Sequence, residues 1–479
     1  MSQFFKILDQ RLNLRYLHYR LWVEAKEITR FIGQRRSLNP QTRFSIVVPC
    51  YGIKLIYVIE MVESLKRQSY KNWELCIADD GDPDPQVWQY FNQLKLTWGE
   101  RLKLTRHEKN AGICAATRSA ISLAKGDFVV FIDADDTLHA QTLQLLALRI
   151  AEVSDCDFVY SDHDFMTDWS WRIFPLRKPD WSPELLLTVN YINHITAVRR
   201  EILTSNTDFF ADRFSGGQDT DFVLKMISRS RRVLHVPFVL YHWRTRPGSV
   251  AASVDAKPWA FAAGALARSE YVRSLGLGLK LNRGVLAREQ NSEPLKIHIA
   301  DEERRDGGEW ISFLTSAAEG EAAEKLLFFG SDSIEGELEP LLAYVTLPQV
   351  GVGHVFFKKG LRAAYSSGKQ NPGVMKRVTG SRSAYSHYTG NIQAGPLLGA
   401  AMQVGSLRRI LEALKVRPDF LSMTLSLSAV GVFMGLTALR LGLRNVSVDG
   451  AWIKEQARDQ IDDQLEVPAE LWPRFDNYF

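Results

Sequence analysis

Phe128-Val129-Val130-Phe131-Ile132-Asp133-Ala134-Asp135-Asp136 places an apolar run directly before three carboxylates. The run is rich in β-branched and aromatic residues and follows the turn-like Lys125-Gly126-Asp127, which predicts a strand buried on both faces. In an open α/β sheet, such a strand delivers the residues that follow it to the carboxyl edge, where ligands bind. Asp133 and Asp135 are two positions apart, so on an extended backbone they point the same way.

These aspartates allow two interpretations. Like charges held this close repel each other unless a cation lies between them, and a hard divalent ion with oxygen ligands suits such a site. The alternative is a loop of solvated or helix-capping aspartates, because Asp is common at caps and turns. The rest of the chain has to decide between the two.

Composition narrows the class of protein. A chain of 479 residues predicts two or three domains. The formal net charge is only +4, and no basic tract is interleaved with aromatic residues, so nucleic acid is not expected as a partner. The four cysteines, Cys50, Cys76, Cys114 and Cys156, form no CxxC motif and predict buried thiols in a reducing compartment.

Two segments bear on membranes. Residues 1–43 are basic, and their apolar residues recur at helical spacing, which predicts an amphipathic helix that packs on its own domain or attaches to an anionic membrane surface. Phe420–Leu439 is uncharged and long enough to span a bilayer, but Ser, Thr and Gly dilute it, so a buried element is expected. No signal-peptide core follows Met1, and the expected location is the cytoplasm, with peripheral contact at the inner face of the plasma membrane.

Strands and helices alternate along the first part of the chain. The expected strands are 44–49, 73–78, 102–105, 128–132, 158–162 and 236–240. Alternation at this spacing predicts a doubly wound, mostly parallel α/β sheet with Asp80, Asp133 and Asp135 along one edge. Further on, Gln218-Asp219-Thr220-Asp221 opens a helix, and Tyr241-His242-Trp243-Arg244 is expected in a loop that suits phosphate or metal.

Six motifs occur in one order. They are Ser45-Ile46-Val47-Val48-Pro49-Cys50-Tyr51, Asp79-Asp80-Gly81, Asn110-Ala111-Gly112 with Arg118, Asp133-Ala134-Asp135-Asp136, Gln218-Asp219-Thr220-Asp221 and Tyr241-His242-Trp243-Arg244. In this order and spacing, residues 44–290 resemble a family 2 glycosyltransferase with the GT-A fold. The stretch from Lys178 to His194 is similar to a bacterial subgroup that assembles O-antigens, capsules and other surface polysaccharides.

The resemblance implies a nucleotide-sugar donor site. Asp80 would hydrogen-bond the nucleotide base, in a pocket shaped by Pro49 and Tyr51. Arg118 would face the diphosphate. Gln218, which precedes the implied base, would lie with these residues at the donor.

The resemblance also implies a metal site and a catalytic base. Asp133 would lie near the ribose or the metal, and Asp135 would ligate Mn²⁺ or Mg²⁺ with help from Asp136. His242 would complete the metal or diphosphate site. Asp219 would be the base that deprotonates the acceptor hydroxyl, and attack from the face opposite the leaving diphosphate predicts inversion.

Residues 295–460 echo the first half. Lys325 to Ser333 matches Phe128 to Asp136, and Arg444 to Val448 matches Arg232 to Val236. The echo keeps Asp332 at the metal position, but Phe420 to Val448 contains no Asp or Glu. We therefore expect a degenerate, non-catalytic GT-A-like domain that serves packing, acceptor binding or complex assembly. The alternative is an unrelated domain, and residues 461–479 form a tail of undetermined role.

The expected activity is an inverting, metal-dependent transfer of a hexosyl or deoxyhexosyl group from a nucleotide sugar. The acceptor would be a growing surface polysaccharide or a lipid-linked glycan, and other polysaccharide-assembly enzymes are candidate partners. The alternatives are a non-catalytic scaffold that binds nucleotide sugar and a two-site polymerase with both halves active.

Overall fold

The computed structural model describes residues 24–187, 189–204, 208–214, 216–245 and 258–277, together with shorter segments between 279 and 453. The chain divides into two compact units. The first contains Met1–Trp181 and Ile192–Arg268, and the second contains Ser182–Tyr191 and Ser269–Phe479. This division lies near Arg268, earlier than the boundary at 290 expected from sequence.

The first unit is built on one mixed sheet. Its strands lie in the order β3 (Leu102–Arg106), β2 (Trp73–Asp79), β1 (Phe44–Cys50), β4 (Phe128–Phe131), β8 (Thr196–Arg199), β6 (Phe158–Met166), β9 (Val233–Arg244) and β5 (Thr137–Leu138). The first four are mutually parallel, and β7 (Arg172–Leu176) pairs with β6. Beyond them β8 runs antiparallel to both β4 and β6, while β6 and β9 are parallel. The predicted α/β fold with a GT-A-like sheet is confirmed.

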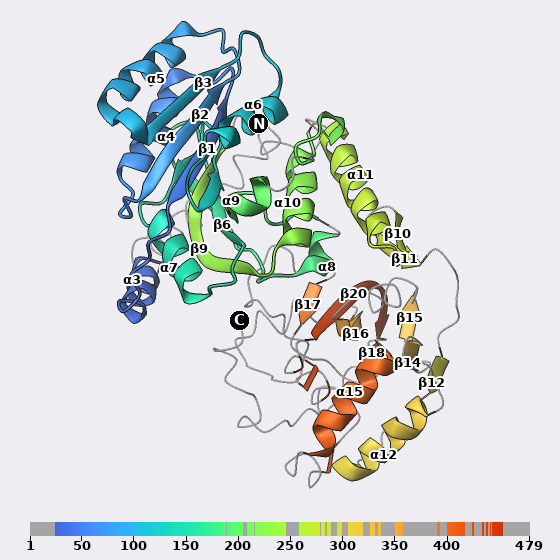
Figure 1. Cartoon of the computed structure of the whole chain (residues 1–479). Coiled ribbons are helices and arrows are strands. Elements are labelled where there is room, and N and C mark those ends of the chain that lie inside the picture. Colours follow the sequence, from blue (N-terminus) through green and yellow to red (C-terminus); the bar gives the residue numbers. More distant parts are fainter. Residues whose placement is uncertain are drawn as a thin grey trace. The chain divides into compact units, whose positions relative to one another are not determined.

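Helices cover both faces of the parallel strands. Among the described residues, the helices of the first unit are α3 (Ala25–Gln34), α4 (Leu55–Lys66), α5 (Pro85–Trp98), α6 (Ile113–Ser122), α7 (Thr142–Glu152), α9 (Arg200–Thr204), α10 (Gln218–Arg229) and α11 (Pro258–Ser274) as far as Arg268. Figure 1 shows α4 and α5 on one side of β1–β3 and α6 on the other. Asp84 caps α5, accepting from the backbone N–H of Gln86 at 2.9 Å, and Pro85 provides its first residue.

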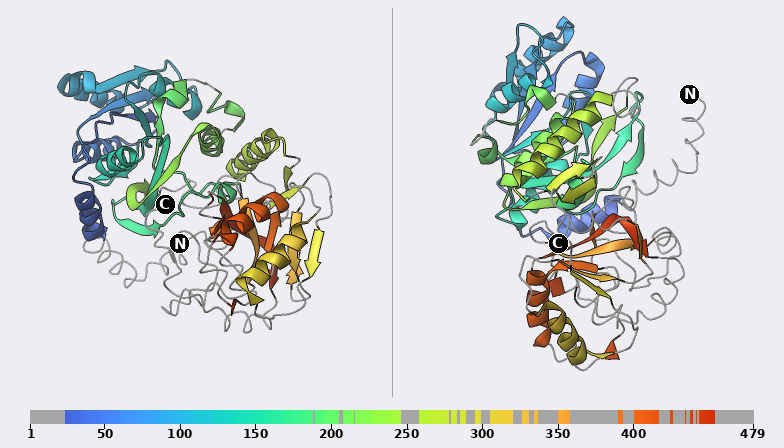
Figure 2. Two further views of the ribbon diagram at one scale, coloured as in Figure 1. Left: turned by 60° about the horizontal axis from the view of Figure 1, so that its bottom comes forward. Right: turned by 90° about the vertical axis from the view of Figure 1, so that its right-hand side faces the viewer.

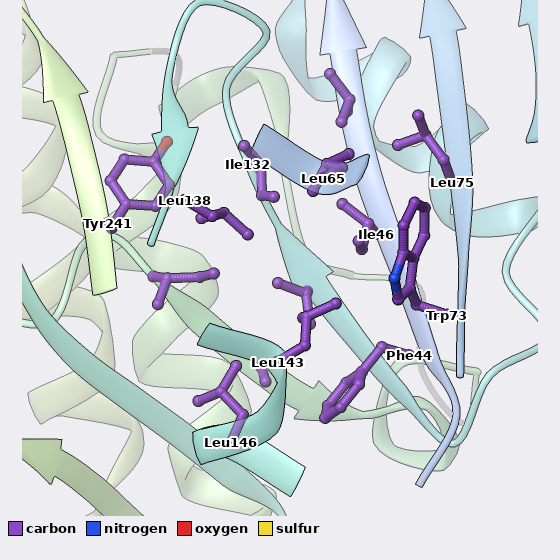
Figure 3. Close-up of a cluster of buried hydrophobic side chains, with 14 of the residues drawn as sticks. Phe44, Ile46, Leu65, Trp73, Leu75, Ile132, Leu138, Leu143, Leu146 and Tyr241 are labelled. Carbon is purple, nitrogen blue, oxygen red and sulfur yellow. The ribbon is translucent and has the colours of Figure 1, made fainter. Parts of the chain in front are cut away.

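The core lies between the sheet and the helices on the α4 side. Phe44 and Ile46 alternate with Ser45 along β1, so they project from the same face, and both are fully buried. Figure 3 shows them in one cluster with Trp73 and Leu75 of β2 and with side chains from α4 and α7. This burial fixes the register of the strands and therefore the position of the residues that follow them.

The carboxyl ends of β1, β2 and β4 meet at one edge, as predicted. Phe44 pairs with both Trp73 and Phe128, so the three strands run level, and Asp80 and Asp133 follow at the same edge. One expectation was wrong: Tyr241–Arg244 is not a loop but the last part of β9, where Tyr241 pairs with Leu138 and with His163. The strand is longer than its apolar run because β5 and β6 supply partners for its polar end.

The second unit repeats the strand arrangement of the first. Its sheet runs β12 (Leu295–His298), β14 (Leu326–Gly330), β18 (Ala400–Gln403), β16 (Val350–Phe357), β20 (Arg444–Ile453), β15 (Ile334–Gly336), with β17 (Gly390–Ile392) beside β20. Taken in that order, β14-β18-β16-β20-β15 reproduces β4-β8-β6-β9-β5 in chain order and in the direction of every pairing.

Further elements complete the second unit. α12 (Gly307–Ala318) and α15 (Val404–Lys415) pack side by side, in yellow and orange in Figure 2. α8 (Pro183–Leu186) packs against β17, and Ser182 caps α8 as its Ser-Pro start predicts. The short pairs β10 (Leu279–Asn282) with β11 (Val285–Arg288) and β13 (Arg305–Asp306) with β19 (Thr424–Leu425) lie outside the main sheet.

The structure also bears on three expectations about location. The predicted helix around Leu8 to Trp22 lies outside the described residues, whereas α3 packs on the core through Ile28 and through Phe31, whose ring lies 5.4 Å from that of Phe238. The described residues contain no helix with the length and apolarity needed to cross a bilayer. All four cysteines are free and buried, as predicted.

Candidate functional site

Three aspartates cluster directly after β4. Carboxylate oxygens of Asp133, Asp135 and Asp136 lie within 4.8 Å of one another. Asp135 and Asp136 are buried, and Asp133 is partly open to solvent. The three aspartates lie in the short turn between β4, which ends at Phe131, and β5, which begins at Thr137. The two strands therefore fix the position of the turn at the edge of the sheet.

The end of β9 holds Asp136 in place. Its oxygens accept hydrogen bonds from the Tyr241 hydroxyl at 2.5 Å and the Arg244 backbone N–H at 2.7 Å. Burial raises the pKa of the Asp136 carboxyl well above its usual value, and the charges of Asp135 and Asp133 raise it further. A divalent cation among the three carboxylates would relieve this repulsion, and an all-oxygen donor set suits Mg²⁺ or Mn²⁺. These residues therefore fit a hard metal ion.

Arg244 was not assigned a role from the sequence, although it closes the Tyr-His-Trp-Arg motif. Its side chain is fully buried, and its Nε donates to the Asp135 carbonyl oxygen at 2.8 Å. The same guanidinium donates to Glu60 of α4 and to the Thr167 carbonyl oxygen. Arg244 thus fixes the backbone of the aspartate turn through the Asp135 carbonyl oxygen.

A cavity brings Asp133 together with the first turn of α10. Asp133, Gln218 and Asp219 line it. The wall also includes Pro49, Phe131 and Phe210. Desolvation by the surrounding chain raises the pKa of the Asp219 carboxyl, His194 opposes the rise, and Asp133 adds to it, although solvent still reaches the side chain. The predicted convergence of Asp133 and Asp219, far apart in sequence, is therefore present in the fold.

His194 belongs to the same cavity and was missed as a site residue. Its ring stacks on Tyr241 with centroids 4.8 Å apart, and its Nε2 lies 3.7 Å from Asp133 Oδ2. Burial lowers the pKa of His194 to about 4, so the ring is neutral near pH 7. The ammonium of Lys178 donates to the carbonyl oxygens of Ile192 and His194 and so anchors this segment. The only sequence signal was the subgroup-like stretch from Lys178 to His194.

The residues expected around the nucleotide base and the diphosphate are not all in this cavity. Asp80 accepts from the backbone N–H groups of Ala111 and Gly112 at 2.9 and 2.8 Å, which orders the predicted turn there. Tyr51 is half exposed. Arg118 lines a neighbouring hollow on α6 rather than the aspartate cavity, and its guanidinium donates to the Phe210 carbonyl oxygen.

His242 is held by an acidic residue of β6. Its Nδ1 is 2.7 Å from Asp164 Oδ1, and it pairs with Thr137 across the β5–β9 ladder. Among the described residues that could hold a metal ion together, His242 is not grouped with the aspartates. Its predicted part in the metal site stays a prediction.

Part of this chain is similar to known proteins. Residues 45–205 match the family model described as glycosyl transferase family 2. An uncharacterized protein, y4gI, from Sinorhizobium fredii is 37% identical over 239 residues, which are 50% of this chain and 26% of that protein. The O-antigen biosynthesis protein RfbC of Myxococcus xanthus is 28% identical over 54% of this chain and 20% of its own length. The chain thus spans about a quarter or less of these two relatives.

Among solved structures, a crystal structure of S. aureus TarS in complex with UDP-GlcNAc is similar to this chain. The two are 20% identical, with a TM-score of 0.37, over 48% of this chain and 71% of that one.

Proposed function

The chain carries a glycosyl transferase family 2 domain, and from this premise we propose that it is an inverting, metal-dependent glycosyltransferase of surface-polysaccharide assembly. It would move a hexosyl or deoxyhexosyl group from a nucleotide sugar to a hydroxyl of a growing polysaccharide or lipid-linked glycan. The observation that carries the proposal is the shared cavity of Asp133 and Asp219. The O-antigen relative supports the acceptor class.

The proposed reaction assigns each residue a task. Asp219 accepts the proton of the acceptor hydroxyl, whose oxygen forms the new bond to the anomeric carbon while the bond to the diphosphate oxygen breaks. Asp135 and Asp136, with Asp133, would hold the cation, which neutralises charge on the leaving diphosphate. His194 lines the same cavity, and burial lowers its pKa to about 4, so its ring is neutral near pH 7. Such base catalysis is typically worth about 10²–10⁴ in rate.

The test is a donor screen followed by paired variants. The full chain is incubated with Mn²⁺ or Mg²⁺ and a panel of nucleotide sugars, and release of nucleoside diphosphate is measured. Asp219→Asn is expected to lower turnover by at least ~10² while donor binding survives. Asp221→Asn is the matched control, since Asp221 lies on the same helical turn but is paired with Lys225 at 3.0 Å.

Two results would count against this function. If no donor is turned over with any acceptor, the alternative of a non-catalytic scaffold that binds nucleotide sugar gains. If Asp219→Asn turns over as fast as Asp221→Asn, Asp219 is not the base. Chelation should also stop turnover of the unmodified chain, and restored Mn²⁺ should recover it.

For the second unit we propose a non-catalytic role. Its strand order repeats that of the first, but Phe420 to Val448, which precedes and enters β20, has no carboxylate to serve as a base. Asp332, the one acid at the metal position, lies outside the described residues. The absence of a base argues against a two-site polymerase, and packing, acceptor binding or assembly with other enzymes are the roles that need no base.

A further inference from the structure

The turn between β6 and β7 exposes two indole rings. Trp169 is 86% exposed and Trp171 is 69% exposed, and Phe174 follows at 39%. Large apolar side chains gathered in this way mark ligand or partner surfaces more often than chance. Neither tryptophan has a place in the cavity of Asp133 and Asp219 or in the proposed reaction.

This turn is a fixed structure. The Thr167 N–H donates to the Trp171 carbonyl oxygen at 2.9 Å, and the Ser170 N–H donates to the Thr167 carbonyl oxygen at 2.9 Å. Helix α4 also holds the turn: the Tyr57 hydroxyl donates to Asp168 at 3.2 Å, and the Ser170 hydroxyl donates to Glu60 at 3.0 Å. The indoles are therefore presented on a preorganised support, which lowers the entropy cost of binding.

One buried side chain, that of Arg244, joins this turn to the aspartate turn of residues 133–136. The Arg244 guanidinium donates to the Thr167 carbonyl oxygen at 3.2 Å and to the Ser170 hydroxyl at 3.4 Å. Its Nε donates to the Asp135 carbonyl oxygen at 2.8 Å. The aromatic turn thus lies within one arginine side chain of the aspartate turn, close enough for a chain-like ligand to reach both.

Charge beside the tryptophans selects the kind of ligand. Asp168 is acidic and adjoins Trp169, whereas Glu60 is ion-paired with Arg244, and the basic Arg172 is paired with Asp164 at 2.6 Å. An anionic lipid surface is repelled by such a patch. A neutral sugar fits it, since its C–H face packs on an indole and its hydroxyls donate to carboxylates.

We propose that Trp169 and Trp171 bind neutral sugar residues of the acceptor glycan, away from the hydroxyl that reacts. The proposal rests on the proposed function for the identity of the glycan as acceptor. It adds a second contact with the polymer, so longer acceptors bind more tightly than short ones.

The test measures glycan binding without donor or turnover. Lipid-free polysaccharide from the cells that make this protein is immobilised, and retention of the full-length chain is measured by surface plasmon resonance. Trp169→Ala/Trp171→Ala is expected to bind at least ~10-fold more weakly, and Trp169→Phe/Trp171→Phe to recover most binding. Leu96→Ala, at a site on α5 that is 86% exposed, is the matched control and should bind normally.

Two companion measurements separate the outcomes. Vesicles of phosphatidylethanolamine and phosphatidylglycerol replace the polysaccharide in one arm, and nucleoside diphosphate release without acceptor is measured in the other. Failure of the donor reaction alone would sink the proposed function but leave a tryptophan-dependent glycan contact standing. Equal glycan binding by the Ala double variant, no binding by the unmodified chain, or tryptophan-dependent binding to vesicles alone would each overturn the inference.

Discussion

Asp219 and Asp221 show how a single residue's surroundings decide its role. Both lie on the first turn of α10, where either carboxylate would interact favourably with the helix dipole. Asp221 is buried and paired with Lys225 at 3.0 Å, whereas Asp219 lines the cavity that also contains Asp133. The sequence pattern indicates that one of the two merely stabilises the helix, and the family resemblance favours Asp219 as the base. The packing of α10 is consistent with this choice, because it is Asp219 that lines the cavity.

Lys178 provides a test of how the cavity wall is held. Its buried ammonium donates to the carbonyl oxygens of Ile192 and His194, and the nearby Asn193 and His194 line the cavity. Lys178→Met keeps the length of the side chain but removes the hydrogen bonds to these two carbonyl oxygens. We expect turnover to fall by about 10-fold or more through misplacement of His194. A melting curve and nucleotide affinity measured alongside should change little; a variant as active as the unmodified chain would exclude this positioning role.

Asp157 carries a stability prediction with a defined pH window. Burial opposes ionisation, but hydrogen bonds from Arg231 and Arg199, at 2.6–2.9 Å, lower the pKa of Asp157 to about 2. Because this pKa lies below the unfolded value, the ionised group stabilises the fold above about pH 4, and the contribution is lost as pH falls toward 2. Asp157→Asn should therefore lower the unfolding free energy by about 1–2 kcal/mol at neutral pH, discounted because Arg231 faces solvent.

Urea unfolding from neutral pH down to the lowest pH at which the chain stays folded would check this. The gap between Asp157→Asn and the unmodified chain should narrow below about pH 4. Asp155→Asn is a suitable control, since Asp155 is 43% exposed and pairs with Arg232, which is 54% exposed. If the difference in unfolding free energy between the two chains stays constant over the acid range, ionisation of Asp157 does not stabilise the fold.

At the scale of elements, buried strands were predictable and side-chain neighbours were not. The run from Phe128 to Ile132 predicts a buried strand by itself, because hydrophobicity and β-branching are properties of the local sequence. The alignment of Asp133 with Asp219 followed only from the family resemblance. His194 and Arg244 take their roles from Tyr241, Lys178 and Thr167, partners far away in sequence, and no local pattern specifies such pairs.

The contact between α10 and α11 allows a test of how Asp219 is positioned. Gly217 immediately precedes α10, and a Cβ there would lie 2.4 Å from the backbone N of Gly264 in α11. Gly217→Ala must therefore push the start of α10 away, and we expect turnover to drop with a loss of stability of about 1–3 kcal/mol. Turnover and thermal unfolding are measured together.

Gly264→Ala is the matched control from the other side of the same contact. A Cβ on Gly264 would meet its nearest neighbour, Thr220 Oγ1, at 3.4 Å, which is ordinary contact. Ala also favours a helix over Gly by roughly 1 kcal/mol, so this variant should be as stable as the unmodified chain or more so. Equal behaviour of the two variants would show that the close approach at Gly217 does not position α10.

At the scale of the whole molecule, the chain contains one topology twice. The match of β14-β18-β16-β20-β15 with β4-β8-β6-β9-β5 extends to every pairing direction, which unrelated α/β domains would seldom reproduce. The weak sequence echo between the halves is thus supported by strand order. Under the proposed non-catalytic role, the burial pattern that builds the sheet would have persisted although Phe420 to Val448 contains no carboxylate.

The last prediction concerns the segment Ser182–Tyr191, which groups with the second unit although the chain on both sides of it belongs to the first. Leu185, Leu186 and Leu187 are at most 3% exposed. A chain that ends after Ser274 keeps only residues 269–274 of the rest of that unit, so these leucines should become exposed and cause self-association. Replacing all three leucines with Ser in the short chain should restore a monomer, as measured by size-exclusion chromatography. In the full chain the same replacement should lower the free energy of unfolding by several kcal/mol, since loss of a buried Leu typically costs about 2–5 kcal/mol.

Nucleoside diphosphate release by the Ser-substituted short chain would then show that the second unit is dispensable for catalysis. If the short chain is monomeric with its leucines intact, the assignment of this segment to the second unit is wrong.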